Sequence, residues 1–154
     1  MSIAVGDKAP DFDLPTDGGG HVKLSDLRGK PVVIYFYPKD MTPGCTTESC
    51  DFRDQNPDFA ALNAKIIGIS KDSAARHDKF KAKHDLNFTL ASDEESDTCE
   101  KYGVWKEKSM YGKKYMGIER TTVLIDAEGV IRNIWEKVKV KGHVDAVLAA
   151  IKAL

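Results

Sequence analysis

The chain has 154 residues, 42% hydrophobic and 31% charged, and this length and composition predict one globular domain spanning residues 1–154. Its 23 Lys and Arg nearly balance its 24 Asp and Glu, which argues against nucleic acid and against an anionic membrane surface as partners. Three cysteines are too few for a disulfide-stapled scaffold. No apolar run approaches a membrane span and no secretory signal is visible at the start, so we expect a cytoplasmic protein with reduced thiols.

The beginning of the chain has the pattern of two short strands. Apolar residues alternate with polar ones on both sides of a glycine run at 18–20, which predicts a β-hairpin within residues 3–24. A single helical turn is expected at 25–29, where the sequence ends in glycine.

The clearest strand and helix follow directly. Residues 32–37 are β-branched or aromatic at every position, which is typical of a central strand covered on both faces. A helix is predicted over 43–62, with Thr42 as its N-cap and a proline at its first position. Pro57 lies inside this span, so we expect a break or kink near Asn56.

The rest of the chain completes a layered α/β pattern. In order we expect a strand at 65–70, a helix at 74–84, a short strand at 89–91, a short helix at 94–102, a surface loop at 105–117, an antiparallel pair of strands at 121–126 and 130–135, and a terminal helix with Val144, Val147, Leu148 and Ile151 on its apolar face. This order predicts a thioredoxin-like fold, a mixed central sheet flanked by helices, with an N-terminal β-hairpin extension.

The segment between the central strand and the long helix carries the chemistry. Cys45 falls in the first turn of the helix, where unpaired backbone N–H groups and the helix dipole stabilise a thiolate, the nucleophilic form of cysteine. Thr42 can place a hydroxyl beside the sulfur, and Pro43 stiffens the turn. A lone cysteine is more often a small buried hydrophobe, but the strand–loop–helix context and a second cysteine favour a reactive thiol.

That second cysteine, Cys50, lies five residues further along the same helix. In an intact helix the Cα atoms of Cys45 and Cys50 would be roughly 8.7 Å apart, whereas a disulfide needs less than about 7 Å. If the two cysteines bond, the helix must therefore unwind locally. A zinc site is not expected, because the four histidines are scattered and no C-x₂-C or H-x₃-H spacing occurs.

These residues match a known signature. Pro38-x₃-Thr42-x₂-Cys45 resembles the peroxiredoxin active-site motif, and the run from Thr42 to Thr46 with Cys50 beyond it is similar to the bacterioferritin comigratory protein group, also called PrxQ. The similarity extends over essentially the whole chain and includes the stretches 6–12, 86–88, 103–105 and 117–120.

The resemblance assigns roles to individual residues. It implies that Cys45 is the peroxidatic cysteine, which becomes a sulfenic acid, and that Cys50 is the resolving cysteine of the same chain. Thr42 would orient the peroxide, and Arg120 would stabilise the thiolate and the transition state. The residues that shape the pocket would be Pro38, Pro43 and Gly44.

The implied activity is that of a thiol-dependent peroxidase acting on hydrogen peroxide and organic hydroperoxides. It needs no metal or other cofactor, and its reductant would be thioredoxin, or glutaredoxin in some members. A monomer or weak dimer is expected, because resolution within one chain needs no partner subunit. Two alternatives stay open, a general thiol–disulfide exchange protein and a peroxide sensor.

Other residues invite ordinary interpretations. Cys99 is expected to be a buried or semi-buried thiol outside the redox pair, and Glu48 a helix-supporting residue or an acceptor behind the site. His77 and His84 are expected to be solvated or partly packed rather than ligands. The lysine-rich and aromatic part of the expected loop, 105–115, is expected to be a mobile flap near the site.

Overall fold

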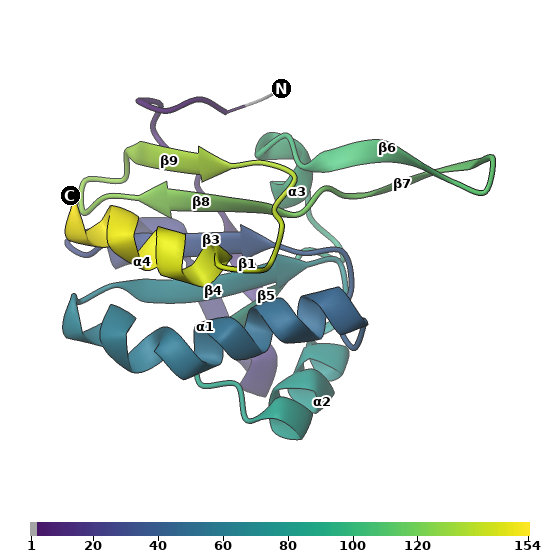
Figure 1. Cartoon of the computed structure of the whole chain (residues 1–154), viewed down its shortest axis with the longest axis horizontal. Helices are drawn as coiled ribbons and strands as arrows, with labels where there is room; N and C mark the ends of the chain where they lie inside the picture. The colour runs from purple at the N-terminus through teal and green to yellow at the C-terminus, as the bar shows by residue number, and fades with distance from the viewer. Residues whose placement is uncertain (1–2) are drawn as a thin grey trace.

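A five-stranded mixed sheet forms the centre of the computed structural model, which describes residues 3–154 (Figure 1). The strand order is β5-β4-β3-β8-β9. The strands are β3 (Val32–Phe36), β4 (Lys65–Ser70), β5 (Thr89–Ser92), β8 (Thr121–Ile125) and β9 (Ile131–Trp135). β4 pairs in parallel with β3 and β5, and β8 pairs antiparallel with β3 and β9. The predicted mixed sheet is therefore confirmed.

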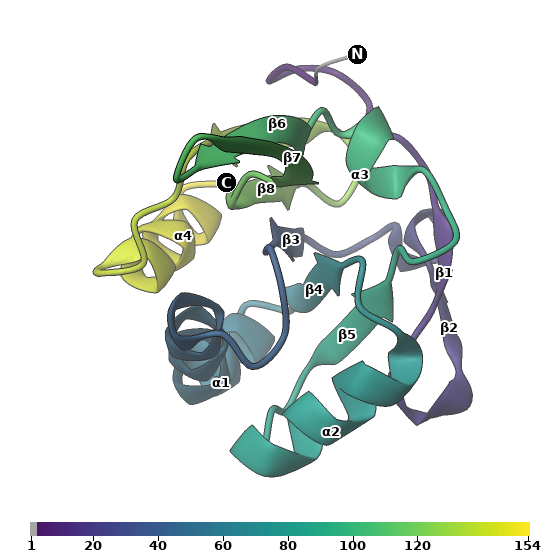
Figure 2. The same cartoon turned by 90° about the vertical axis from the view of Figure 1, so that its right-hand side faces the viewer.

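Helices and the N-terminal hairpin cover the two faces of this sheet (Figure 2). α1 (Pro43–Ala61) and α4 (His143–Lys152) lie on one face, and Phe80 of α2 (Ala74–His84) packs into the same hydrophobic cluster. The other face carries α3 (Thr98–Lys101) and the antiparallel pair β1 (Asp13–Pro15) and β2 (His21–Lys23). Two short 3₁₀ helices accompany this pair, η1 (Asp17–Gly19) and η2 (Leu24–Leu27).

β3 is buried along its whole length, as its sequence predicts. Val33 and Tyr35 point into the cluster under α1 and α4, whereas Ile34 and Phe36 point into the cluster under the hairpin. Such alternation places apolar side chains on both faces of the strand. β3 therefore holds its carboxyl end, from which α1 is reached, in a fixed position.

Of the break or kink expected near Asn56, the break does not occur, because α1 is one helix through Pro57. Pro57 has no N–H for the carbonyl of Arg53, which loses its helical partner. The side-chain amide of Asn87 donates to that carbonyl instead, at 3.2 Å, and Asn56 donates to the carbonyl of Asn87 at 2.9 Å. A loop outside the helix thus satisfies the acceptor that the proline leaves free.

The expected surface loop at 105–117 is also wrong. This segment is a two-stranded hairpin of β6 (Trp105–Met110) and β7 (Lys113–Ile118), which projects from the body as an arm (Figure 1). Tyr111 and Gly112 form its turn, both with positive φ, a backbone geometry that suits a two-residue hairpin connection. Most side chains on the arm are exposed on both faces, so the sequence lacks the apolar alternation that marks a half-buried strand.

The short helix expected at 94–102 is confined to α3. Among residues 3–154, no helix is long and apolar enough to cross a membrane.

Asn87→Ala tests whether the Asn87 side chain replaces the helical hydrogen bond that Pro57 cannot donate to Arg53. The substitution removes the donor to the carbonyl of Arg53, and we expect the free energy of unfolding in urea to fall by about 1 kcal/mol. In the Pro57→Ala background the new N–H at position 57 can bond that carbonyl, so Asn87→Ala should cost less there. An equal cost in both backgrounds would contradict this account.

Candidate active site

Cys45 lies at the junction of β3 and α1, where the sequence places it. Thr42 is the N-cap of α1, and its carbonyl accepts the first helical hydrogen bond from Thr46 N–H at 2.9 Å. Cys45 is the third residue of the helix and only 1% exposed. Its sulfur is therefore in the first turn, where N–H groups lack helical partners and the helix dipole favours negative charge.

Arg120 contacts this sulfur although it lies 75 residues away in the sequence. Its Nη2 donates to Cys45 Sγ at 3.3 Å. The pairing of Phe36 with Thr121 in the antiparallel β3–β8 ladder brings Arg120, one residue earlier, to the end of β3 that leads to α1. The sheet register thus supplies the cation that the sequence pattern could only suggest.

Glu48 holds the other end of the guanidinium. It lies one helical turn after Cys45, and its Oε1 accepts from Arg120 Nη1 at 2.7 Å. The carboxyl is fully buried, and burial raises its pKa to about 7, with the attraction of Arg120 offsetting part of the effect. Oε2 has no hydrogen-bond partner within the described residues. Glu48 is thus an acceptor behind the site, one of its two expected roles.

The Arg120 guanidinium responds to both neighbours. Burial lowers its pKa, but the charges of Glu48 and Cys45 and their hydrogen bonds more than offset this, so its pKa lies above the ordinary value. Gly44 leaves room for the group, because a Cβ there would lie 3.2 Å from Arg120 Nη2. The small residue and the buried carboxylate together fix one orientation of the guanidinium against the sulfur.

Thr42 and Pro43 begin α1, and Pro38 lies in the connection between β3 and α1. The Thr42 hydroxyl donates to the Lys39 carbonyl at 2.8 Å, which leaves its oxygen lone pairs free to accept. Pro43 is exposed at the first position of α1. Pro38 also lines an open pocket of about 310 Å³. Its lining from the β6–β7 arm comprises Trp105, Lys108, Tyr115, Met116, Gly117 and Ile118.

The other two cysteines differ in their surroundings. All three thiols are free, and Cys50 is half-buried on α1. Cys99 is fully buried in the cluster on the opposite face of the sheet from Cys45. Burial, followed by the charge of Asp93, raises the pKa of the Cys99 thiol far above its ordinary value. The structure therefore brings Cys45 and Cys50 onto one helix and leaves Cys99 apart from them.

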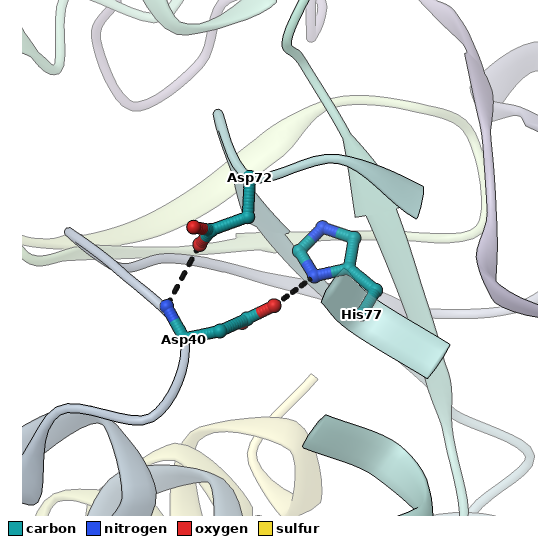
Figure 3. A group of neighbouring side chains, drawn as sticks. All are labelled: Asp40, Asp72 and His77. Atoms are coloured by element: carbon teal, nitrogen blue, oxygen red, sulfur yellow. Dashed lines mark hydrogen bonds and ion pairs between the residues drawn. The ribbon is translucent and has the colours of Figure 1, made fainter. Parts of the chain in front are cut away.

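A buried polar cluster beside the site is absent from the sequence-based expectations (Figure 3). His77 is fully buried, so the expectation of a solvated or partly packed side chain is wrong. Its Nδ1 lies 2.6 Å from Asp40 Oδ2, and Asp72 Oδ2 accepts from the backbone N–H of Asp40 at 2.7 Å. The residues lie on three separate segments, so no short motif marks them. Asp40, Asp72 and His77 offer three possible metal-ligand atoms within 4.8 Å of one another, but each side chain is already hydrogen bonded within the protein.

Comparison with known proteins decides the family. The model of the AhpC/TSA family matches residues 5–134. The chain belongs to this family of peroxiredoxins. It is 57% identical to peroxiredoxin Bcp of Bacillus subtilis, over 99% of this chain and 97% of the relative, and 45% identical to peroxiredoxin Bcp of Escherichia coli, over 97% and 96%.

Solved structures agree with this assignment. The bacterioferritin comigratory protein of Xanthomonas campestris superposes with a TM-score of 0.88 at 50% identity, covering 92% of this chain and 90% of the other. A PrxQ mutant of Xylella fastidiosa gives 0.94 at 39% identity, covering 99% and 98%. The chain is thus a peroxiredoxin of the Bcp/PrxQ group with a thioredoxin-like fold, a peroxidase that reduces peroxide at the expense of a thiol reductant.

Glu48→Gln tests the buried carboxyl through the pH dependence of stability. The pKa of the Glu48 carboxyl is 4.5 in the unfolded chain and about 7 in the folded protein. Between these pH values the folded state binds more protons than the unfolded state, so its stability falls as pH rises. Over the full window this lowers the free energy of unfolding by about 3 kcal/mol.

Glutamine cannot ionise, so the wild-type minus variant difference in free energy of unfolding should decline from about pH 4.5 to about pH 7. Urea unfolding of both proteins across this range measures it. A difference that does not change with pH would show that burial does not shift the pKa of Glu48.

Proposed function

We propose that Cys45 is the peroxidatic cysteine and that Arg120 and Thr42 act with it on the peroxide. The observation that carries the proposal is the 3.3 Å contact from Arg120 Nη2 to Cys45 Sγ in the first turn of α1. A guanidinium and a helix N-terminus on one sulfur favour the thiolate, which is the attacking species. The Thr42 hydroxyl, whose oxygen can accept a hydrogen bond from the peroxide O–H, lies at the N-cap of α1.

The reaction transfers one oxygen atom. The Cys45 thiolate attacks one peroxide oxygen, the S–O bond forms while the O–O bond breaks, and the departing oxygen takes a proton to become water or an alcohol. Charge develops on the departing oxygen during this step. Donors already fixed around it stabilise that charge without reorganising, and Arg120, held by Glu48, is such a donor.

We propose that Cys50 then resolves the sulfenic acid, forming an intramolecular Cys45–Cys50 disulfide and releasing water. Both residues lie in α1, where a spacing of five residues separates their Cα atoms by roughly 8.7 Å. Because a disulfide needs less than about 7 Å, the first turns of α1 must unwind in every cycle.

The reducing partner is proposed to be thioredoxin, or alternatively glutaredoxin, whose dithiol reopens the disulfide by thiol exchange. The substrates are proposed to be hydrogen peroxide and organic hydroperoxides. The open pocket beside Pro38, with Trp105, Met116 and Ile118, offers space for an organic group, and the Xanthomonas relative is described for its alkyl peroxide reduction activity. Residues 1–154 would act in the cytoplasm as a single domain, as a monomer or weak dimer, without nucleic acid or membrane partners.

Peroxide consumption with thioredoxin as reductant tests these roles. Cys45→Ser should abolish it, because no thiolate remains to attack. Thr42→Val keeps the size of the side chain but removes its hydroxyl, and it should lower the second-order rate with peroxide by about two orders of magnitude.

The same variants separate the alternatives. Thr42→Val should leave reduction of a small-molecule disulfide unchanged if that reaction occurs, since it needs no peroxide orientation. Full peroxidase activity in Cys45→Ser would overturn the proposal. Equal effects of Thr42→Val on both reactions would indicate a general thiol–disulfide exchange protein, and oxidation of Cys45 without turnover would indicate a sensor.

A further inference from the structure

Asp40 has a wholly buried carboxyl group and lies five residues before Cys45 (Figure 3). Each polar atom of its side chain and backbone has a hydrogen-bond partner within the protein. Tyr37 O–H donates to its Oδ1, and His77 Nδ1 lies 2.6 Å from its Oδ2. Its backbone N–H donates to Asp72 Oδ2 at 2.7 Å, and its carbonyl accepts from Arg76 Nη2 at 3.2 Å. The loop that leads to the active site is thus bonded to the β4–α2 connection and to α2.

The His77 ring explains why an acidic residue fits here. Its Nε2 lies 3.0 Å from the Ala91 carbonyl, which can only accept, so Nε2 carries a proton. The opposite nitrogen and Asp40 Oδ2 must then share a second proton, since a carboxylate also only accepts. A buried carboxylate with this many donors is held in one position, and removing it would leave several donors unpaired.

Met41, the next residue, has a backbone conformation that needs support. Its φ is 69°, in the left-handed region that side chains other than glycine rarely adopt. Met41 lies between Asp40 and Thr42, the N-cap of α1, and its side chain packs against the cluster under α1 and α4. An unfavourable conformation persists only where its surroundings impose it, and the bonds of Asp40 are the restraint immediately before it.

We propose that Asp40 is a positioning residue for peroxide reduction, which holds Met41 in the left-handed conformation and thereby sets Thr42 and the first turn of α1, with Cys45, in the geometry that attacks peroxide. The inference rests on the proposed role of Cys45. It assigns to the Tyr37–Asp40–His77 cluster a task at the active site, although none of these side chains is placed against the sulfur.

The first test is the second-order rate constant of the reduced protein with hydrogen peroxide, measured by competition with a haem peroxidase. Asp40→Ala removes the side-chain bonds of this restraint, to Tyr37 and His77, and should lower this constant by about tenfold or more. Asp40→Asn should stay within about threefold of wild type, because its amide can donate to neutral His77 while its oxygen still accepts from Tyr37.

The decisive test is a double-mutant cycle with Met41→Gly. Glycine adopts positive φ without strain, so the turn no longer depends on Asp40. The factor by which Asp40→Ala lowers the rate constant should therefore be about five times smaller in the Met41→Gly background than in the wild-type background. Comparing ratios within each background cancels the packing that Met41→Gly itself removes.

Asp93→Ala is the matched control, since Asp93 is equally buried and accepts from the backbone N–H groups of Thr98 and Cys99 at the start of α3. It should lower stability, and its effect on the rate constant should be the same in both Met41 backgrounds. If Asp40→Ala does not fold, His77→Ala takes its place in the cycle with the same expected coupling.

Equal losses in the two Met41 backgrounds would overturn the proposal, and so would an unchanged rate constant in Asp40→Ala. In either case loss of activity in Cys45→Ser would show that the proposed peroxidase mechanism stands without it. Peroxidase activity in Cys45→Ser would instead overturn both.

Discussion

The contact between Arg120 and the Cys45 sulfur is the interaction on which the site depends. It joins two segments that meet only because β8 pairs antiparallel with β3 in one register, with Thr121 opposite Phe36. A shift of that register by one residue would turn the side chains of β8 to the other face and move Arg120 away from the sulfur. The completely buried central strand prevents such a shift, so the hydrophobic core and the chemistry are fixed by the same residues.

The proposed cycle makes opposite demands on α1. The helix must be formed to hold Cys45 beside Arg120, and its beginning must unwind for Cys50 to reach the sulfur. The structure suggests where unwinding stops. Phe52 and Phe59 are fully buried in the core cluster between α1 and the sheet, and the Asn87 side chain donates a hydrogen bond to the carbonyl of Arg53. These contacts stabilise the later part of α1 in its helical form. On the other side of the segment, the buried bonds of Asp40 hold the loop.

Much of this architecture follows from local sequence patterns. The apolar run of β3 and the proline that begins α1 predict both elements at nearly their observed bounds. The errors arise where distant groups override local preference, or where an element is largely exposed on both faces. Pro57 leaves α1 unbroken because Asn87 bonds the freed carbonyl, and the β6–β7 arm carries no apolar alternation because both of its faces are largely exposed. The burial of His77 depends on a partner in another loop, which spacing along the chain does not reveal. Arg120 could be assigned only by resemblance, since its contact with Cys45 is a property of the sheet.

Amide hydrogen exchange of α1 in the reduced and oxidised protein tests the central claim most directly, that the helix which holds Cys45 for attack must unwind for resolution. One equivalent of hydrogen peroxide, with non-reducing mass mapping of the disulfide, prepares the oxidised form. We predict that the amides of residues 43–51 lose protection against exchange when the Cys45–Cys50 disulfide is present, while those of 52–61 keep their protection. The Cys50→Ser variant treated with peroxide should show the protection pattern of the reduced protein. A mapped Cys45–Cys50 disulfide with unchanged protection of 43–51 would contradict the account.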